Sequence, residues 1–198
     1  MNFQEDLSAI KTMMQRSTRF SALSGISGIL AGLYALVGVC IALYNSWSFQ
    51  QASIENLTES KLALCWLGIS VAFAAIATAA FFSHRQIRKQ GLSFWNHAIQ
   101  KMLTNFLMPL IAGGIVLILL FLRGPLEWIP GMSLLFYGLA LHAASRDTYP
   151  EIRLLGWIQA VLGILALWYP HYAIAFWATG FGLFHIGYGA YFMIRYER

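Results

Sequence analysis

Charged residues are scarce in this chain: Asp, Glu, Lys and Arg make up 11% of its 198 residues, whereas hydrophobic residues make up 59%. Soluble domains carry about a quarter charged residues. Together with a mean hydropathy of +0.62, this composition excludes an ordinary soluble domain and indicates an integral membrane protein. The length leaves room for about six spans of ~20 residues and for no separate soluble module.

Motifs for hydrolysis and nucleotide chemistry are also missing, since the chain contains no GxSxG, HExxH, CxxC or phosphate-binding loop. Asp and Glu are absent from the interior of every apolar run. This argues against proton- or cation-coupled transport, which commonly uses an intramembrane carboxylate. The lack of a lysine in the middle of a run excludes an opsin-like Schiff base. These absences favour a protein that is not an enzyme.

What the chain has instead is a series of long apolar runs that carry charge only near their ends. Runs of this length are typical of transmembrane helices. The six runs cover residues 20–44, 61–82, 103–122, 127–145, 151–169 and 171–194. We therefore predict an all-α fold, a polytopic membrane protein with six transmembrane helices, in which residues 1–198 form a single integral membrane domain.

Local signals refine three of these helices. Pro109 predicts a kink in the third span. Thr148 and Glu151 match a capping box with Pro150 in the first turn, so the fifth helix should begin there. The stretch WYPHY at 168–172 leaves little chain between the last two spans, which predicts a tight hairpin.

The basic residues are distributed unevenly along the chain. If the N-terminus is cytoplasmic, the outer segments hold only Lys61 and Arg123 of the 13 Lys and Arg residues, and the other eleven lie inside. By the positive-inside rule, both termini should be cytoplasmic. This asymmetry explains the formal net charge of +5 without nucleic acid. The short loops favour a bacterial inner membrane.

Two cytoplasmic segments carry apolar residues at helical spacing, and we interpret both as amphipathic helices at the inner interface. The first is residues 1–19. The second runs into the third span. Their apolar positions are Phe3, Leu7, Ile10, Met13 or Met14, and Phe20 in the first, and Trp95, Ile99, Met102 and Phe106 in the second. The two helices either anchor the bundle or dock a cytoplasmic partner and gate an inner opening.

Small residues recur along the runs at spacings that place them on one helix face. Because close contact between helices in a bilayer depends on small residues, we interpret these faces as contacts with neighbouring helices. The residues are Ser24, Gly28 and Gly32; Gly131, Gly138 and Ser145; Gly156 and Gly163; and Gly182 and Gly189.

Two histidines lie within apolar runs. His185, in GFGLFHIGYGAYF (180–192), is near the middle of the last span, and His142 is near the inner end of the fourth. A neutral imidazole can bind a metal or haem, pass a proton, or bond to a neighbouring helix. The two histidines differ in depth by roughly 8 Å at 1.5 Å per residue, which weakens a shared haem. We predict no cofactor, with haem or metal as the alternative.

Other polar side chains lie at depths similar to that of His185. Gln159 is on the same side of its helix as Gly156 and Gly163. Tyrosine hydroxyls are further polar groups at these depths. If they converge with His185, they line a small polar pocket, and if they do not, each is an isolated bond between helices worth about 0.6 kcal/mol. The predicted ligand-binding residues are His185, Gln159, Tyr34, Tyr137, Tyr188 and His142.

The two cysteines, Cys40 and Cys65, lie at similar depth on consecutive spans. A disulfide on the oxidising side is one interpretation. We favour two small buried cysteines.

Three stretches carry a resemblance that covers most of the chain. They are RFSALSGISGILAGLYAL (19–36), LLFYGLALHAASRDT (134–148) and FWATGFGLFHIGYG (176–189). The chain resembles a group of small six-span bacterial inner-membrane proteins of unassigned function. The resemblance implies a location in the bacterial inner membrane and brings no activity, cofactor or site.

These observations predict a non-enzymatic multi-pass membrane protein that binds a small or lipidic ligand, or a protein partner, in a sensing or interaction role. Its partners would be membrane lipids, a second copy of the chain or a cytoplasmic protein, and not nucleic acid. A small transporter or channel is the alternative. It would need an inverted repeat, and the only sign of one is a weak similarity between GLYAL at 32–36 and YGLAL at 137–141. A haem- or metal-binding redox protein is the third interpretation.

Overall fold

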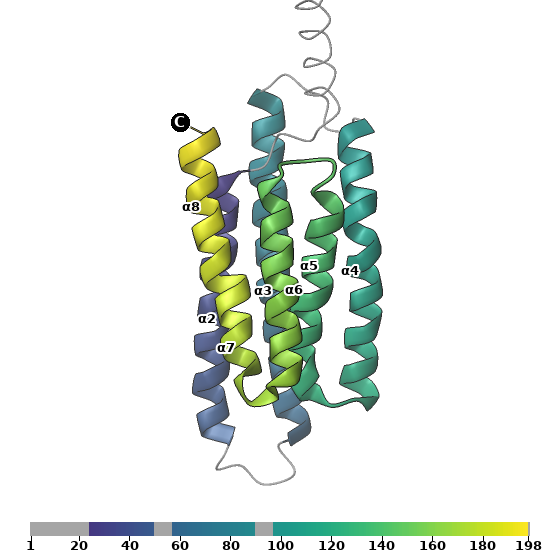
Figure 1. The fold of residues 1–198 in the computed structure, drawn as a ribbon. Coiled ribbons are helices and arrows are strands. Elements are labelled where there is room, and N and C mark those ends of the chain that lie inside the picture. The colour runs from purple at the N-terminus through teal and green to yellow at the C-terminus, as the bar shows by residue number, and fades with distance from the viewer. Residues whose placement is uncertain (1–23, 50–56, 90–96, 198) are drawn as a thin grey trace, which may run out of the picture.

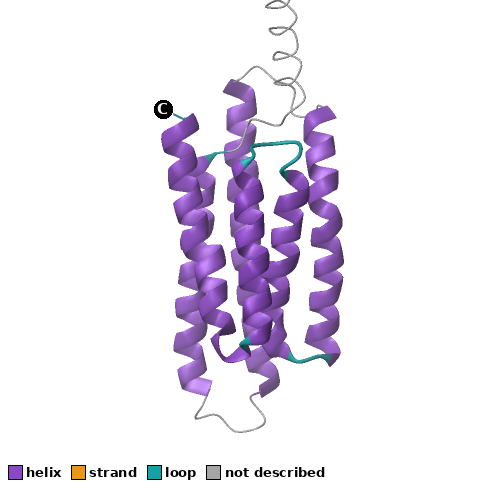
Figure 2. Ribbon diagram, viewed as in Figure 1, coloured by secondary structure: helices purple, strands orange, loops and turns teal. Residues whose placement is uncertain are grey.

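The computed structural model describes residues 24–49, 57–89 and 97–197, whose regular structure is entirely helical (Figure 2). The elements are α2 (Gly25–Phe49), α3 (Leu57–Lys89), α4 (His97–Arg123), η2 (Leu126–Trp128), α5 (Ile129–Ala144), α6 (Glu151–Trp168), η3 (Pro170–Tyr172), α7 (Ala173–Trp177), η4 (Ala178–Phe184) and α8 (His185–Tyr196). η4 is a π-helical turn, and α7, η4 and α8 follow one another without a break. The predicted all-α fold is confirmed for these residues.

The helices stand side by side as a bundle in which successive helices run in opposite directions (Figure 1). The α5–α6 connection and the C-terminus lie at one end, which we call the C-terminal end. The α4–α5 and α6–α7 connections lie at the opposite end. α5 packs on both α4 and α6, whereas α2 packs on α3, on η4 and on α8.

Four helical segments are long and apolar enough to cross a membrane: Gly25–Tyr44, Lys61–Lys89, Ile99–Arg123 and Glu151–Trp168. They fit an integral membrane protein, as the composition predicts. α5 has only 16 residues, and the last predicted span is divided among α7, η4 and α8. Four of the six predicted spans therefore meet a length and composition criterion for a membrane span.

The helices extend beyond the apolar runs that predicted them. α3 continues past residue 82 to Lys89, and α4 begins at His97 rather than at 103. These added turns are rich in Arg, Lys and Gln, which are good helix formers, so the helix continues where the hydrophobicity ends. α4 is also one continuous helix through Pro109.

The two predicted interfacial helices have different outcomes. Residues 1–19 lie outside the described residues. The second continues into the third span, because residues 97–106 are the first turns of α4, and Trp95 lies outside the described residues. Ile99 is buried there against Ile87 of α3, with Met102 and Leu103 packed around them. The apolar face that suggested membrane contact thus packs on protein.

Close approaches between helices occur at the predicted small residues. A Cβ atom on Gly138 of α5 would lie 2.5 Å from the backbone nitrogen of Ala160 in α6. A Cβ atom on Gly163 of α6 would lie 2.6 Å from the backbone nitrogen of Leu135. Such distances leave room only for hydrogen, so the prediction that these glycines are helix contacts is confirmed.

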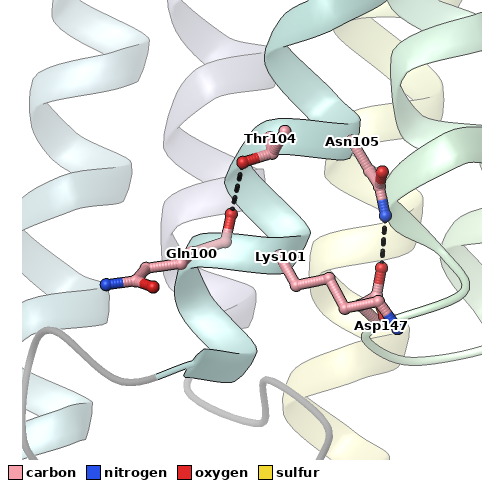
Figure 3. A network of polar contacts seen from close by, with 5 residues as sticks. All are labelled: Gln100, Lys101, Thr104, Asn105 and Asp147. Carbon is pink, nitrogen blue, oxygen red and sulfur yellow. Dashed lines mark hydrogen bonds and ion pairs between the residues drawn. The ribbon is translucent and has the colours of Figure 1, made fainter.

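Asp147, in the α5–α6 connection, ties that connection to α4 (Figure 3). Its side chain is buried, with Oδ1 2.9 Å from Lys101 Nζ and Oδ2 accepting a hydrogen bond of 2.6 Å from Asn105 Nδ2. Lys101 and Gln100 extend to different sides of α4, and Thr104 donates to the Gln100 carbonyl. A loop is therefore held in place by a buried carboxylate with two partners.

Carboxylates also hold the first residues of α6 and α2. α6 begins at Glu151, as predicted, and its N-cap residue is Pro150. Glu151 Oε1 accepts a hydrogen bond of 2.7 Å from the Tyr196 hydroxyl of α8. Glu197 Oε1 accepts a hydrogen bond of 2.7 Å from the backbone nitrogen of Gly25, the first residue of α2. The last turn of α8 thus contacts both helix starts.

Cys40 and Cys65 are both free thiols. The prediction that they are buried is wrong: Cys40 is exposed and Cys65 is partly exposed. A thiol behaves as a small apolar group, so it can lie at a helix surface that faces lipid.

Candidate functional site

The carbonyl oxygen of Gly180, within the π-helical turn η4, is the centre of a buried polar cluster. It lies 3.0 Å from Nδ1 of His185 and 2.8 Å from Nε2 of Gln159. A π-helical turn interrupts the regular α-helical ladder, and side chains then compete for the backbone groups. Here one carbonyl receives donors from the following helix and from α6.

The hydrogen bonds of His185 determine its tautomer. The Gly180 carbonyl can only accept, so Nδ1 carries the proton and donates to it. Nε2 is then an acceptor, and the Tyr137 hydroxyl of α5, 2.9 Å away, donates to it. His185 is buried and uses both ring nitrogens. It connects α8 to α5 and to the turn that precedes it.

Gln159 is fully buried in the middle of α6. Its Nε2 lies 3.3 Å from His185 Nδ1, but that nitrogen is already a donor, so the amide donates to Gly180 only. Its Oε1 has no hydrogen-bond partner. The amide lies directly against η4, because a Cβ atom on Gly180 would be 2.5 Å from Oε1.

Aromatic rings enclose the cluster. Phe181 stacks on His185 with ring centroids 5.7 Å apart and lies 5.0 Å from Tyr137. Towards the opposite end of the bundle, Trp177 packs on Phe181 and donates to the Ser133 hydroxyl at 3.1 Å. Beyond them lies an apolar core formed by Leu134, Ala166 and Ala173. This core closes the cluster on that side.

Three of the six predicted site residues, His185, Gln159 and Tyr137, therefore come together. Tyr188 lies one helical turn away in the apolar cluster of Leu141, Ile152 and Leu155, to which Tyr137 also belongs. Its ring packs on Phe192 with centroids 5.8 Å apart, and its hydroxyl is buried.

The other two predicted site residues lie elsewhere. Tyr34 of α2 pairs its hydroxyl with Thr78 of α3 at 3.3 Å. The ring of His142 packs edge-on against Trp157 at a centroid distance of 5.0 Å. Tyr34 was predicted from its depth and His142 as a histidine within an apolar run, and neither signal specifies which neighbouring helix the side chain meets.

The arrangement does not suit haem or metal ligation. An axial ligand needs a free ring nitrogen, and both nitrogens of His185 face protein partners. His142 is on another face of the α5–α6 pair, against Trp157. Within the described ranges, no group of three or more His, Cys, Asp or Glu residues could hold a metal ion.

Four buried polar atoms in the described part of the chain have no hydrogen-bond partner: His142 Nδ1, Glu151 Oε2, Gln159 Oε1 and Tyr188 OH. They belong to α5, α6 and α8, and none lies among the apolar core residues near the opposite end. Buried polar groups in proteins are normally satisfied by protein, by ordered water or by a ligand. The unused hydrogen-bonding capacity of these helices therefore lies between the middle of the bundle and its C-terminal end.

Sequence reasoning missed the Gly180 carbonyl, Phe181 and Glu151. A backbone carbonyl gives no signal in a sequence unless the local helix type is known. Phe181 is one of many phenylalanines in apolar runs. Glu151 was interpreted as a helix cap, and its position in the first turn of α6 gave no indication that Tyr196 would reach it.

No protein-family model matches this chain, and neither a curated protein nor a solved structure matches it.

Proposed function

We propose that the chain crosses a bacterial inner membrane six times, with both termini in the cytoplasm. The 16 residues of α5 span about 24 Å at 1.5 Å per residue, short of the ~30 Å hydrocarbon core. Immediately before it, η2 adds a further helical turn. Residues 173–196 are helical throughout, which supports a sixth span. The excess of Lys and Arg at the C-terminal end supports the orientation.

Within this bundle, we propose that the protein binds a small ligand and acts without catalysis, in a sensing or interaction role. The observation that carries this proposal is the set of unpaired buried polar atoms on α6 and α8, namely Glu151 Oε2, Gln159 Oε1 and Tyr188 OH. An unpaired buried polar group costs about 1–3 kcal/mol, so a ligand that pairs with several of them gains affinity from groups already desolvated.

The chemistry of the unpaired atoms indicates the ligand class. Gln159 Oε1 and Glu151 Oε2 are acceptors, and Tyr188 OH can accept or donate. The surrounding side chains are aromatic and aliphatic. A ligand with hydrogen-bond donors on a compact apolar body would match both.

Native mass spectrometry of the full chain, released gently from detergent, tests this proposal. The wild type should retain an added small mass. Tyr188→Phe and Gln159→Leu should lose that mass, because each removes one unpaired polar atom. Tyr34→Phe is the matched control, since Tyr34 pairs with Thr78 outside the cluster, and it should retain the mass.

Two results would count against ligand binding here. Bare masses for the wild type and all variants would leave the cluster as a tie between helices. An added mass that persists in Tyr188→Phe and Gln159→Leu would place the ligand elsewhere in the protein.

A further inference from the structure

The buried face of the C-terminal helical rod changes by one residue at η4. Ala173 of α7 and Gly180 of η4 are both buried and lie seven residues apart. If the rod were α-helical throughout, the same face would continue at residues 184, 187 and 191. Phe184 and Tyr191 are instead exposed, and nothing lies within 4 Å of a Cβ atom on Gly187. In α8, the residues that face the core therefore lie one position later in the sequence than an unbroken α-helix would place them.

Three contacts depend on this shifted face, and they run from the first residue of α8 to its last. His185 reaches Tyr137, Gly189 lies against α2, and Tyr196 donates to Glu151. The three residues recur at i, i+4 and i+11, which is one face of an α-helix. η4 therefore sets the rotation of all of α8, because it accommodates one residue more than an α-helix would.

The polar cluster is the structure that holds η4 in place. Gln159 and His185 both donate to the Gly180 carbonyl inside η4, and Gln159 belongs to a different helix, α6. Without these donors, the Gly180 carbonyl would be free to accept from the backbone four residues on, as in an α-helix. The turn would then gain regular hydrogen bonds and lose its extra residue.

We propose that η4 is a one-residue register switch that couples the polar cluster to the C-terminal end of the bundle. In the α-helical register, α8 rotates by about 100°, the angle per residue of an α-helix. Each core position is then taken by the residue before it: Phe184 replaces His185, Tyr188 replaces Gly189 and Arg195 replaces Tyr196.

The rotated state has a defined mechanical consequence. A Cβ atom at Gly189 would lie 2.5 Å from the carbonyl oxygen of Gly25 and 2.7 Å from the backbone nitrogen of Ile29. A tyrosine at this position cannot fit, so α8 must separate from α2. The bond from the Gly25 nitrogen to Glu197 and the bond from Tyr196 to Glu151 are then lost.

The natural trigger of the switch rests on the proposed function. A ligand that breaks the hydrogen bond from the Gln159 amide to the Gly180 carbonyl would allow η4 to become α-helical. The switch itself is testable without any ligand, because Gln159→Leu removes the same hydrogen bond. A bundle that switches but binds nothing would therefore separate the two proposals.

Spin-label accessibility to oxygen in nanodiscs measures the rotation directly. The reporters are Tyr191→Cys and Ile194→Cys, each in the full chain with Cys40→Ser and Cys65→Ser. Both positions are exposed on α8. In the rotated register, residue 191 takes the buried place of Phe192, whereas residue 194 takes the exposed place of Arg195.

With Gln159→Leu, the label at 191 should lose severalfold of its oxygen accessibility, and the label at 194 should stay unchanged. Tyr34→Phe, the matched control, should change neither. His185→Phe, which removes the other donor to Gly180, should repeat the effect of Gln159→Leu. Helix content and monodispersity identify any variant that has not folded.

A deletion makes the test independent of side-chain loss. Leu183 is an exposed residue of η4, and deleting it removes the extra residue, so α8 keeps its native face even when η4 becomes α-helical. Combined with Gln159→Leu, the deletion should restore accessibility at 191. An unchanged label at 191 in folded Gln159→Leu and His185→Phe, or a loss that the deletion does not restore, would overturn the switch.

Discussion

Gly180 is the residue on which the polar cluster depends most, because its Cα lies against two buried side chains. A Cβ atom there would be 2.5 Å from Gln159 Oε1 and 2.5 Å from Leu134 Cδ2. We expect Gly180→Ala to lower the free energy of unfolding by about 1–3 kcal/mol, the usual cost of overpacking a core.

The matched control for this substitution is Gly187→Ala in α8, where nothing lies within 4 Å of the added atom. It should leave the stability unchanged or raise it by up to ~1 kcal/mol, since alanine is the better helix former. Equilibrium unfolding in mixed micelles measures both. Equal losses for the two variants would show that Gly180 is not a special contact.

The Tyr137–His185 hydrogen bond gives a second prediction. Tyr137→Phe removes the donor to Nε2 and leaves a buried acceptor unpaired, so we expect a loss of about 1 kcal/mol, within the range for bonds between membrane helices. Tyr34→Phe removes only a 3.3 Å contact with Thr78 and should cost less than about 0.6 kcal/mol. The reverse order in the same unfolding assay would contradict the hydrogen bonding described for His185.

The sequence predicts part of this site. Gln159, Tyr137 and His185 are polar side chains at similar depth in apolar runs, which made them candidates for one cluster. Tyr34 gives the same signal and lies on another face, against α3. Depth follows from counting residues, whereas direction depends on which helices pack together.

At the scale of elements, Asp147 holds the α5–α6 connection to α4. Asp147→Ala should destabilise the protein by about 1–3 kcal/mol, because it leaves the Asn105 amide without its acceptor and removes a buried ionic hydrogen bond. Lys101 is mostly exposed, so Lys101→Met should cost less than about 1 kcal/mol. Thermal unfolding distinguishes them, and a larger loss for Lys101→Met would mean that the ion pair, rather than the amide, holds the loop.

Tyr149, in the same connection, gives a prediction about pH. Burial raises the pKa of its hydroxyl, and the neighbouring Tyr196 and Glu151 raise it further. A group whose pKa is raised on folding stabilises the protein below its unfolded pKa, about 10 for tyrosine, and loses that contribution as pH rises through the folded pKa.

The melting temperature should therefore fall as the pH rises above about 10, and Tyr149→Phe should reduce this fall. Tyr172→Phe, at the opposite end of the bundle, is the control and should retain the wild-type dependence. Identical pH profiles for the wild type and Tyr149→Phe would contradict the assignment of this effect to Tyr149.

The start of α6 could be predicted from a local signal, whereas the π-helical turn before α8 could not. Glu151 starts α6 where Pro150 indicated, because proline leaves a strong local signal. The π-helical turn η4 left none, since its residues are as apolar as those on either side. Its signature is a shift in the buried face between Gly180 and His185, which becomes visible only once the neighbouring helices are placed.

At the scale of the whole molecule, composition predicted an apolar helical bundle, and it did not predict which helices are neighbours. α3 packs on α2, and α4 packs on α5. Their sequences are equally apolar, and a bilayer provides little hydrophobic drive to bring one helix rather than another into contact. Packing is decided instead by small residues and a few hydrogen bonds, whose directions are not readable from the sequence.

The proposed six-span arrangement depends on α5 crossing the membrane, and α5 is the shortest of the helices proposed to cross as a single regular segment. Arg123 and Arg146 are exposed residues on its two sides along the chain. Single cysteines at these positions, with Cys40→Ser and Cys65→Ser, can be labelled with a membrane-impermeant maleimide. If α5 spans the membrane, Arg123→Cys should react in intact cells and Arg146→Cys only in inverted vesicles. Reaction of both cysteines from the same side would contradict the six-span bundle.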